Sequence, residues 1–239
     1  MADRAAIVTG ASSGIGLEIA RMLGHEGHGL TLASRRPDKL DAVASQLAAE
    51  GLDVQAVAGN LGVEEDEQRV VATHRDRYGR LDVLVNSAGV GFGEPVAELT
   101  TKKVDIQLST NLRSVILFYR ECQELLLAAG AEGGALVVNL ASIAGKHGQP
   151  WLSVYGATKA AILNFSQAMG RELAGTGVKS TALCPAYVDT PMTDFVKGEI
   201  PAEQMITTGD VVEAVRFLLR LSPNCIVPEI VLARPDEGL

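Results

Sequence analysis

The sequence has few cysteines, few aromatic residues and no long apolar run. Its three cysteines, Cys122, Cys184 and Cys225, lie far apart and form no C-x-x-C pair. This spacing disfavours a disulfide framework and a structural zinc site, and it suits a reducing cytoplasm. The four histidines are scattered without H-x-x-x-H spacing, so we predict no metal site. No apolar run approaches the ~20 residues that span a bilayer, so we expect no contact with a membrane.

Positive charge is also scarce. Lysine and arginine together number 21 against 29 acidic residues, giving a net charge of −8. This balance disfavours nucleic-acid binding, which needs basic side chains to neutralise phosphates. The N-terminus passes from Met1-Ala2-Asp3-Arg4 directly into an apolar segment, with no signal-peptide pattern. We therefore expect a cytoplasmic protein.

Short apolar runs recur along the chain and are separated by longer stretches of helical character. Most of these runs are apolar at consecutive positions, which predicts strands that are buried on both faces, as in a parallel sheet. The predicted strands are Ala5–Thr9, Leu30–Ser34, Val54–Ala58, Leu81–Val85, Ala135–Leu140, Ser180–Cys184 and Glu229–Leu232.

Helices are predicted between these strands, with Asp210 as the N-cap of the last one. They cover Gly14–His25, Pro37–Glu50, Glu64–Tyr78, Lys102–Ala129, Val154–Ala174 and Asp210–Leu221. The alternation predicts an α/β fold with a doubly wound parallel sheet of the Rossmann type and helices on both faces. No repeat, low-complexity tract or linker interrupts it, so we expect residues 1–239 to form a single domain.

A glycine-rich loop follows the first predicted strand and opens the first helix. It reads Gly10-Ala11-Ser12-Ser13-Gly14-Ile15-Gly16, with the spacing G-x-x-x-G-x-G. Glycines let the backbone turn sharply and approach a pyrophosphate, and the helix N-terminus offers N–H groups to the anion. The loop predicts dinucleotide binding through Gly10, Ser12, Ser13, Gly14, Ile15 and Gly16; the alternative is a tight turn without a ligand.

Tyr155 and Lys159 lie four residues apart in a predicted helix, so both side chains reach one face. A phenol titrates near pH ~10, and a neighbouring ammonium lowers that value. The pair can therefore exchange a proton with an alcohol or a carbonyl near neutral pH. Such pairs also occur as ordinary surface contacts, so the interpretation depends on the rest of the sequence.

The glycine loop, Asn86-Ser87-Ala88-Gly89, Asn111, Ser142 and the Tyr155/Lys159 pair occur together in a recognisable order and spacing. In this the chain resembles the classical short-chain dehydrogenase/reductase family, over roughly residues 3 to 225. The resemblance implies hydride transfer between a nicotinamide cofactor and a carbonyl or alcohol. It also implies that Asn86, Ala88 and Gly89 contact the cofactor, and that the protein is a homotetramer or homodimer packed through its fourth and fifth helices.

The end of the second predicted strand bears on the choice of nicotinamide. Folds that prefer NAD place an acid about 20 residues past the glycine loop, where this chain has Ser34, followed by Arg35 and Arg36. Guanidinium groups bind a 2′-phosphate, whereas a carboxylate would repel it. We therefore expect NADP(H) in preference to NAD(H), with Arg35 as the leading ligand. Ser13 is not basic, so only one of the family's two phosphate-binding devices is present.

The resemblance also implies roles for single residues. Ser142 would hydrogen-bond the substrate oxygen, and Tyr155 would exchange the proton. Lys159 would lower the pKa of Tyr155 and hold the nicotinamide ribose, and Asn111 would distort its helix and hold a water. Three further groups of residues would contact the cofactor or cover the substrate. They are Asn60 and Leu61 near adenine, Pro185, Val188 and Thr190 near the nicotinamide, and Pro191–Met205 as a mobile lid.

Two features leave the details open. Ala186 follows Pro185 where the family usually has glycine, so either Ala186 accepts an unusual backbone geometry or the turn differs. The substrate is expected to be a small carbonyl compound or alcohol, bound near Lys146, His147, Gln149, Trp151 and Leu152. The leading hypothesis is a carbonyl reductase or alcohol dehydrogenase. The alternatives are a reductase of 3-oxoacyl thioesters on acyl carrier protein or CoA, and a cofactor-binding regulator without turnover.

Overall fold

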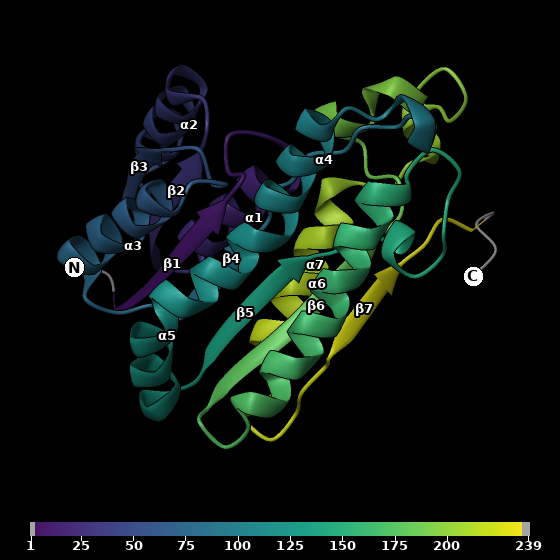
Figure 1. Ribbon diagram of the computed structural model, residues 1–239. Helices are drawn as coiled ribbons and strands as arrows, with labels where there is room; N and C mark the ends of the chain where they lie inside the picture. Colours follow the sequence, from purple (N-terminus) through teal and green to yellow (C-terminus); the bar gives the residue numbers. More distant parts are fainter. Residues whose placement is uncertain (1–2, 236–239) are drawn as a thin grey trace.

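One parallel sheet organises the protein (Figure 1). The computed structural model describes residues 3–235. The sheet has seven strands in the order β3-β2-β1-β4-β5-β6-β7. Their bounds are β1 Arg4–Thr9, β2 His28–Ser34, β3 Val54–Ala58, β4 Val83–Asn86, β5 Ala135–Leu140, β6 Val178–Pro185 and β7 Glu229–Leu232. The doubly wound α/β fold expected from the sequence is confirmed.

The consecutive apolar residues of the strands serve two separate cores. In β1, Ala6 and Val8 belong to one buried cluster and Ile7 to the other. Every residue of β2 and of β5 is buried. Successive side chains of a strand point to opposite faces of the sheet. Because helices cover both faces, all of these side chains are buried, which accounts for the unbroken apolar pattern.

Helices cover both faces of the sheet (Figure 1). The helices α1 Gly14–His25, α2 Pro37–Ala49 and α7 Thr208–Leu219 pack on one face, around Ile19, Leu40 and Val211. The helices α3 Glu64–Tyr78, α5 Ser114–Glu132 and α6 Ser153–Glu172 pack on the other, around Val70, Phe118 and Ile162.

The helix predicted over Lys102–Ala129 is continuous but not uniform. It consists of α4 Thr101–Gln107, a π-helical segment η2 Leu108–Arg113, and α5. π-Helical turns inside α-helices are uncommon and mark functional sites. Asn111 lies within η2 and is fully buried, so the distortion expected at this residue is present.

The last helix begins two residues earlier than predicted, and Asp210 is not its N-cap. Thr207 caps α7: its hydroxyl accepts a hydrogen bond from the Asp210 N–H, and the Asp210 carboxylate accepts one from the Thr207 N–H. This reciprocal arrangement is a capping box, in which the acid stands three residues after the cap. The sequence-based expectation was wrong because an acid in the first turn of a helix can also hydrogen-bond the N–H of the cap residue that precedes it.

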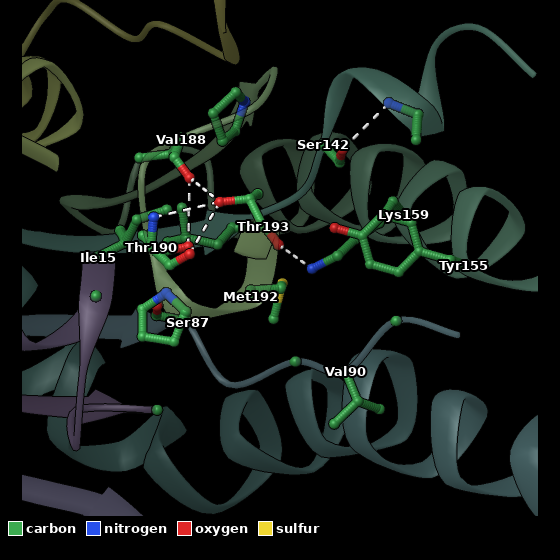
Figure 2. Close-up of a pocket in the computed structure, with 18 of the residues that line it drawn as sticks. Ile15, Ser87, Val90, Ser142, Tyr155, Lys159, Val188, Thr190, Met192 and Thr193 are labelled. Atoms are coloured by element: carbon green, nitrogen blue, oxygen red, sulfur yellow. Dashed lines mark hydrogen bonds between the residues drawn. The ribbon is translucent and has the colours of Figure 1, made fainter. Parts of the chain in front are cut away.

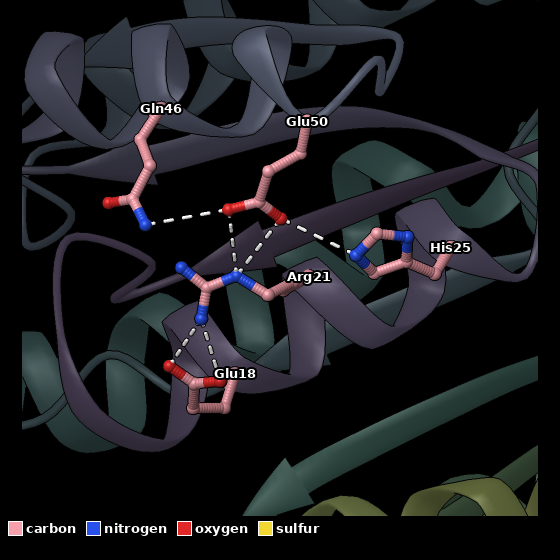
Figure 3. A network of polar contacts seen from close by, with 5 residues as sticks. All are labelled: Glu18, Arg21, His25, Gln46 and Glu50. Atoms are coloured by element: carbon pink, nitrogen blue, oxygen red, sulfur yellow. Dashed lines mark hydrogen bonds and ion pairs between the residues drawn. The ribbon is translucent and has the colours of Figure 1, made fainter.

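A polar network joins α1 to the end of α2 (Figure 3). Arg21 donates to the carboxylates of both Glu18 and Glu50, at 2.7 and 3.2 Å. Glu50 also accepts a hydrogen bond from Gln46 and lies 3.4 Å from His25. The network fixes the two helices beside the glycine loop that α1 follows.

Over residues 3–235, no helix is long and apolar enough to cross a membrane. Within the same range, no cluster of three His, Cys, Asp or Glu side chains could hold a metal ion.

One acidic side chain is buried where α3 packs against α5. Glu67 is fully inaccessible, and the Ser114 side chain near its carboxyl group does not form a hydrogen bond of good geometry with it. Burial raises the pKa of Glu67 to about 8, and Ser114, Arg113 and Arg120 oppose this shift only in part. The folded protein therefore keeps Glu67 protonated at neutral pH.

We expect Glu67→Gln to stabilise the protein increasingly as pH rises. The unfolded chain loses this proton near pH 4.5 and the folded chain near 8, so wild-type stability falls between these values. The loss is at most about 1.4 kcal/mol per pH unit. Urea unfolding from about pH 5 to pH 8 should show a growing advantage of the variant. The exposed neighbour provides the control Glu65→Gln, which should show none; a pH-independent difference for Glu67→Gln would contradict the assignment.

Candidate active site

The order of the strands reverses between β1 and β4, and a crevice opens at their carboxyl ends. The Thr9 hydroxyl joins the two strand ends by accepting hydrogen bonds from the N–H groups of Ser87 and Ala88, both at 3.0 Å. Gly10 follows at φ +67°, where a Cβ would lie 2.8 Å from the Ala88 nitrogen. Only glycine fits at this junction, since a side chain would push the two loops apart.

The glycine loop leaves the N-terminus of α1 accessible. Gly14 has φ +58°, and a Cβ on Gly16 would lie 2.7 Å from the Gly10 carbonyl oxygen. Ser13 is the N-cap but makes no side-chain capping bond, and the first turn contains no acid. The first N–H groups of the helix thus face the crevice without an internal partner, which suits an anion.

A cavity of about 1020 Å³ runs from the glycine loop to the segment before α6 (Figure 2). Nearly all of the predicted site residues line it. They are Gly10, Ser12, Ser13, Gly14, Ile15, Gly16, Ser34, Arg35, Arg36, Asn60, Leu61, Ala88, Gly89, Ser142, Tyr155, Lys159, Pro185, Val188 and Thr190.

Two free cations stand at one end of the cavity. Arg35 and Arg36 are exposed, and within residues 3–235 neither forms an ion pair. Beside them the Ser34 hydroxyl is buried and has no hydrogen-bond partner in the described structure. A buried orphan hydroxyl costs free energy, so this corner is built for a polar, anionic ligand.

The catalytic group lies at the middle of the cavity. Tyr155 and Lys159 extend from one face of α6, and Ser142 lies on the loop after β5 (Figure 2). Two glycines let these segments touch: a Cβ on Gly145 would meet the Lys159 backbone at 2.6 Å, and one on Gly156 would meet the Ala144 oxygen at 2.7 Å. The close packing holds Ser142 within hydrogen-bonding reach of the Tyr155 phenol.

Lys159 is 5% exposed, and its ammonium donates to the Leu140 carbonyl at 2.6 Å. Burial lowers the pKa of Lys159 to about 8. Its charge therefore depends on pH in the neutral range, in contrast to a lysine at the surface.

The expectation that Lys159 lowers the pKa of Tyr155 is wrong for this structure. Burial raises the pKa of the Tyr155 phenol, Tyr187 adds to the shift, and the Ser142 hydrogen bond opposes it. The Lys159 ammonium lies over the ring, 5.6 Å from its centre, and points to Leu140. The phenol is therefore held protonated, which suits a proton donor.

Asn111 supports this group without reaching the cavity surface. Its amide exchanges two hydrogen bonds with the Val90 backbone, both 2.8 Å, and donates to the Thr158 hydroxyl at 3.1 Å. Thr158 in turn donates to the Tyr155 carbonyl at 2.7 Å. The π-helical turn thus connects the loop after β4 to the helix of Tyr155 and Lys159.

Asn86 was predicted to contact the cofactor, but the structure places its side chain elsewhere. Its side chain is buried and donates to Asn139 at 2.9 Å, and it is not part of the cavity lining. The Asn139 amide in turn donates hydrogen bonds to the Tyr119 and Ser166 hydroxyls. The last residue of a short strand can point to either side, and here the pleat directs Asn86 to the core and leaves Ser87 at the cavity.

The turn after β6 needs no glycine. Ala186 donates its N–H to the Leu232 carbonyl at 2.8 Å, and its φ is not positive. Beyond it, Thr190 and Thr193 both donate to the Val188 carbonyl, which fixes the start of the 3₁₀ helix η4 Pro191–Val196. A second short helix, η5 Ala202–Gln204, completes the predicted lid, whose mobility stays a prediction.

The structure adds residues that sequence patterns did not reveal. Ser87, Phe92, Thr110 and Tyr187 line the cavity, as do Gln149, Trp151 and Leu152 from the predicted group. Lys146 and His147 do not; Lys146 pairs with Glu229 instead. The only available signal for Phe92 and Tyr187 was their position just after a predicted strand end.

Comparison with known proteins agrees with this geometry. The family model described as short chain dehydrogenase matches residues 4–200. The chain belongs to the short chain dehydrogenase family. It is thus an oxidoreductase of carbonyl and CH–OH groups, and the resemblance seen in the sequence is confirmed.

The relatives include reductases and dehydrogenases. A protein of Streptomyces virginiae named as a ketoacyl reductase of the monensin polyketide synthase is 39% identical over 198 residues, covering 82% of this chain and 74% of its own. A variant of the actinorhodin polyketide ketoreductase, crystallised with NADPH, has a TM-score of 0.88 and 31% identity, covering 98% of both chains. An alcohol dehydrogenase from Thermococcus sibiricus, complexed with 5-hydroxy-NADP, has a TM-score of 0.89 and 27% identity, covering 99% of this chain and 98% of its own.

We expect Gly10→Ala to destabilise the protein more than Gly27→Ala. Both glycines have positive φ, +67° and +89°, so each alanine carries a strain of about 1–2 kcal/mol. A Cβ at position 27 meets nothing within 4 Å, whereas one at position 10 collides with the Ala88 backbone. Thermal unfolding of both variants checks this, and equal losses would show that the contact between the β1 and β4 loops is not tight.

Proposed function

We propose that this protein transfers hydride between NADP(H) and a ketone or secondary alcohol. One observation carries the proposal: a single cavity has two unpaired arginines at one end and the Ser142, Tyr155 and Lys159 side chains farther along. The arginines suit the binding of a phosphorylated dinucleotide, and the other three side chains suit proton exchange with a carbonyl oxygen. This combination leaves the regulator without turnover as the weaker hypothesis.

The residues present fit the cofactor. Gly10 and Gly16 leave no room for a Cβ, so backbone N–H groups can line a pyrophosphate site at the start of α1. Arg35 and Arg36 would hold a 2′-phosphate, and the orphan Ser34 hydroxyl would hydrogen-bond it. Two of the structural neighbours contain NADPH or an NADP derivative, which supports this assignment.

Side chains of the protein bind the substrate oxygen and supply its proton. The Ser142 hydroxyl and the Tyr155 phenol hydrogen-bond the substrate oxygen, and Tyr155 donates its proton to that oxygen during reduction. The buried Lys159 ammonium, anchored to the Leu140 carbonyl, lies beside the Tyr155 ring and would hold the nicotinamide ribose. When bound, the nicotinamide supplies or accepts the hydride.

A 3-oxoacyl thioester is the second candidate substrate. It is favoured by the similarity to proteins named as ketoacyl reductases. Such a substrate reaches a reductase on a phosphopantetheine arm, which carries a phosphate. Turnover of acetoacetyl-CoA against simple ketones compares the two candidates directly.

We further propose that the protein acts as a homodimer or homotetramer in the cytoplasm. The α4–α5 face supports self-association, because Leu108 and Ile116 are 43% and 40% exposed there. Apolar side chains of this size beside one another suit a covered surface. Light scattering after size-exclusion chromatography measures the oligomeric state.

We expect Arg35→Ala to weaken NADPH binding about 10- to 100-fold and to leave NADH binding unchanged. The variant loses a charge-assisted hydrogen bond that only the 2′-phosphate can accept. Fluorescence titration with both cofactors checks this, with Arg77→Ala outside the cavity as the control. Wild-type protein that prefers NADH would contradict the role of the two arginines.

We expect Tyr155→Phe to lower kcat about 10²- to 10⁴-fold, because the ring stays but the proton donor is lost. NADPH affinity should stay within a factor of about two. Tyr78→Phe, outside the cavity, serves as the control. Retained turnover in Tyr155→Phe would mean that another group donates the proton.

A further inference from the structure

The aromatic residues of this chain are few and unevenly placed. There are one tryptophan, four tyrosines and five phenylalanines, and half of these ten line the active-site cavity. Besides Tyr155 they are Phe92, Trp151, Tyr187 and Phe195, which we call the aromatic rim. The four come from four separate segments of the chain, so their convergence does not follow from the apolar stripe of any one helix.

Much of this surface is open to solvent. Trp151 is 66% exposed and Phe195 is 70% exposed, and Met192, on the same short helix as Phe195, is 47% exposed. Met192 and Lys159 line the same cavity. Large apolar side chains around a cavity are a surface that a ligand covers.

Contacts hold the Trp151 backbone and the Phe92 ring in place. Trp151 has φ +63° and is the one residue other than glycine with positive φ among residues 3–235. Such a conformation is strained for a bulky residue and persists only where the surroundings impose it. Here the Glu94 N–H donates to the Trp151 carbonyl at 2.9 Å. Lys103 pairs with the Glu94 carboxylate and lies 5.8 Å from the centre of the Phe92 ring.

Tyr187 is contacted by a residue near the C-terminal end of the described chain. The Arg234 guanidinium, which follows β7, lies 5.9 Å from the centre of its ring. Tyr187 lines the same cavity as Tyr155 and raises the pKa of that phenol. The rim and the proton-exchanging group therefore face one cavity.

Charge separates the two ends of the cavity. Among the described residues that line it, the only cations are Arg35, Arg36 and Lys159. The rim end contains two carboxylates in its lining, Glu94 and Glu199, and the neutralising partner of Glu94 is Lys103, which is not part of the lining. An anionic group there would meet the Glu199 carboxylate, and the described lining at that end offers it no cation, which costs affinity. Flat rings, by contrast, stack favourably on aromatic faces.

We propose that this enzyme reduces ketones whose carbonyl is attached to a flat aromatic or conjugated ring system without an anionic group, and that Trp151 and Phe195 bind that ring system. The inference rests on the proposed hydride-transfer function. It favours a neutral ring ketone over an aliphatic 3-oxoacyl thioester with a phosphate-bearing arm.

A series of methyl ketones tests the substrate class, because the acetyl group is kept and only the group attached to it is varied. With NADPH in excess, kcat/KM should rise at least about 10-fold from cyclohexyl methyl ketone to acetophenone or 2-acetylnaphthalene. It should fall about 10-fold from 4-acetylbenzamide to the anionic 4-acetylbenzoate. Equal values along the series, or acetoacetyl-CoA as the best substrate, would overturn the inference.

Variants test the two named residues. Trp151→Gly, which accepts φ +63° without strain, and Phe195→Ala should each raise KM for 2-acetylnaphthalene about 10-fold and leave KM for 2-butanone unchanged. Phe217→Ala is the matched control, since Phe217 is 50% exposed on α7 and lies outside the cavity. An equal rise for both ketones would indicate a structural effect and contradict ring binding.

A binding readout does not depend on turnover. Trp151 is the only tryptophan of the chain, so its fluorescence reports on the rim directly. With NADP⁺ present, acetophenone should quench it saturably, and Phe195→Ala should weaken the saturation about 10-fold. If no ketone is reduced at all, the proposed function fails; if ketones are reduced but neither ring dependence nor saturable quenching is seen, only this inference fails.

Discussion

The site depends on the burial of one charged group. Lys159 is almost inaccessible, and its ammonium is anchored to the carbonyl of Leu140, the last residue of β5. This contact requires α6 to lie directly on the segment after β5, which the absence of side chains at Gly145 and Gly156 permits. The same packing brings Ser142 to Tyr155, so one close helix contact places the whole proton-exchanging group. The lowered pKa of Lys159, about 8, is the electrostatic cost of that burial.

Most of the fold could be predicted from the sequence, because its signals are local and repeated. Consecutive apolar residues in strands such as Ala135–Leu140 report two buried faces, and the glycine loop marks the first strand-to-helix turn. The boundaries of α7 and the π-helical turn at Asn111 were less accessible. Both depend on hydrogen bonds to particular partners, Asp210 with Thr207 and Asn111 with Val90, which periodicity does not encode.

Only some of the site residues could be predicted from the sequence. Residues on the glycine loop, at the end of β2 and on α6 were predicted because the backbone fixes their direction. Asn86 was not, since the pleat of a four-residue strand decides whether its side chain points to the cavity or to Asn139. The pKa of Tyr155 was predicted in the wrong direction because burial, which the sequence does not show, raises it, and because the Lys159 ammonium donates to the Leu140 carbonyl. The aromatic rim was missed for the most part because its residues are adjacent only in the folded chain.

The most direct test of the account is to follow the transferred hydrogen. The protein is incubated with NADPH in which both hydrogens at C4 of the nicotinamide are replaced by deuterium and with acetophenone, and the alcohol is analysed by NMR. We predict deuterium at the carbinol carbon of 1-phenylethanol, formed by the wild-type protein and formed at least about 10²-fold more slowly by Tyr155→Phe. Alcohol without deuterium, or labelled alcohol formed equally fast by Tyr155→Phe, would contradict the central claim.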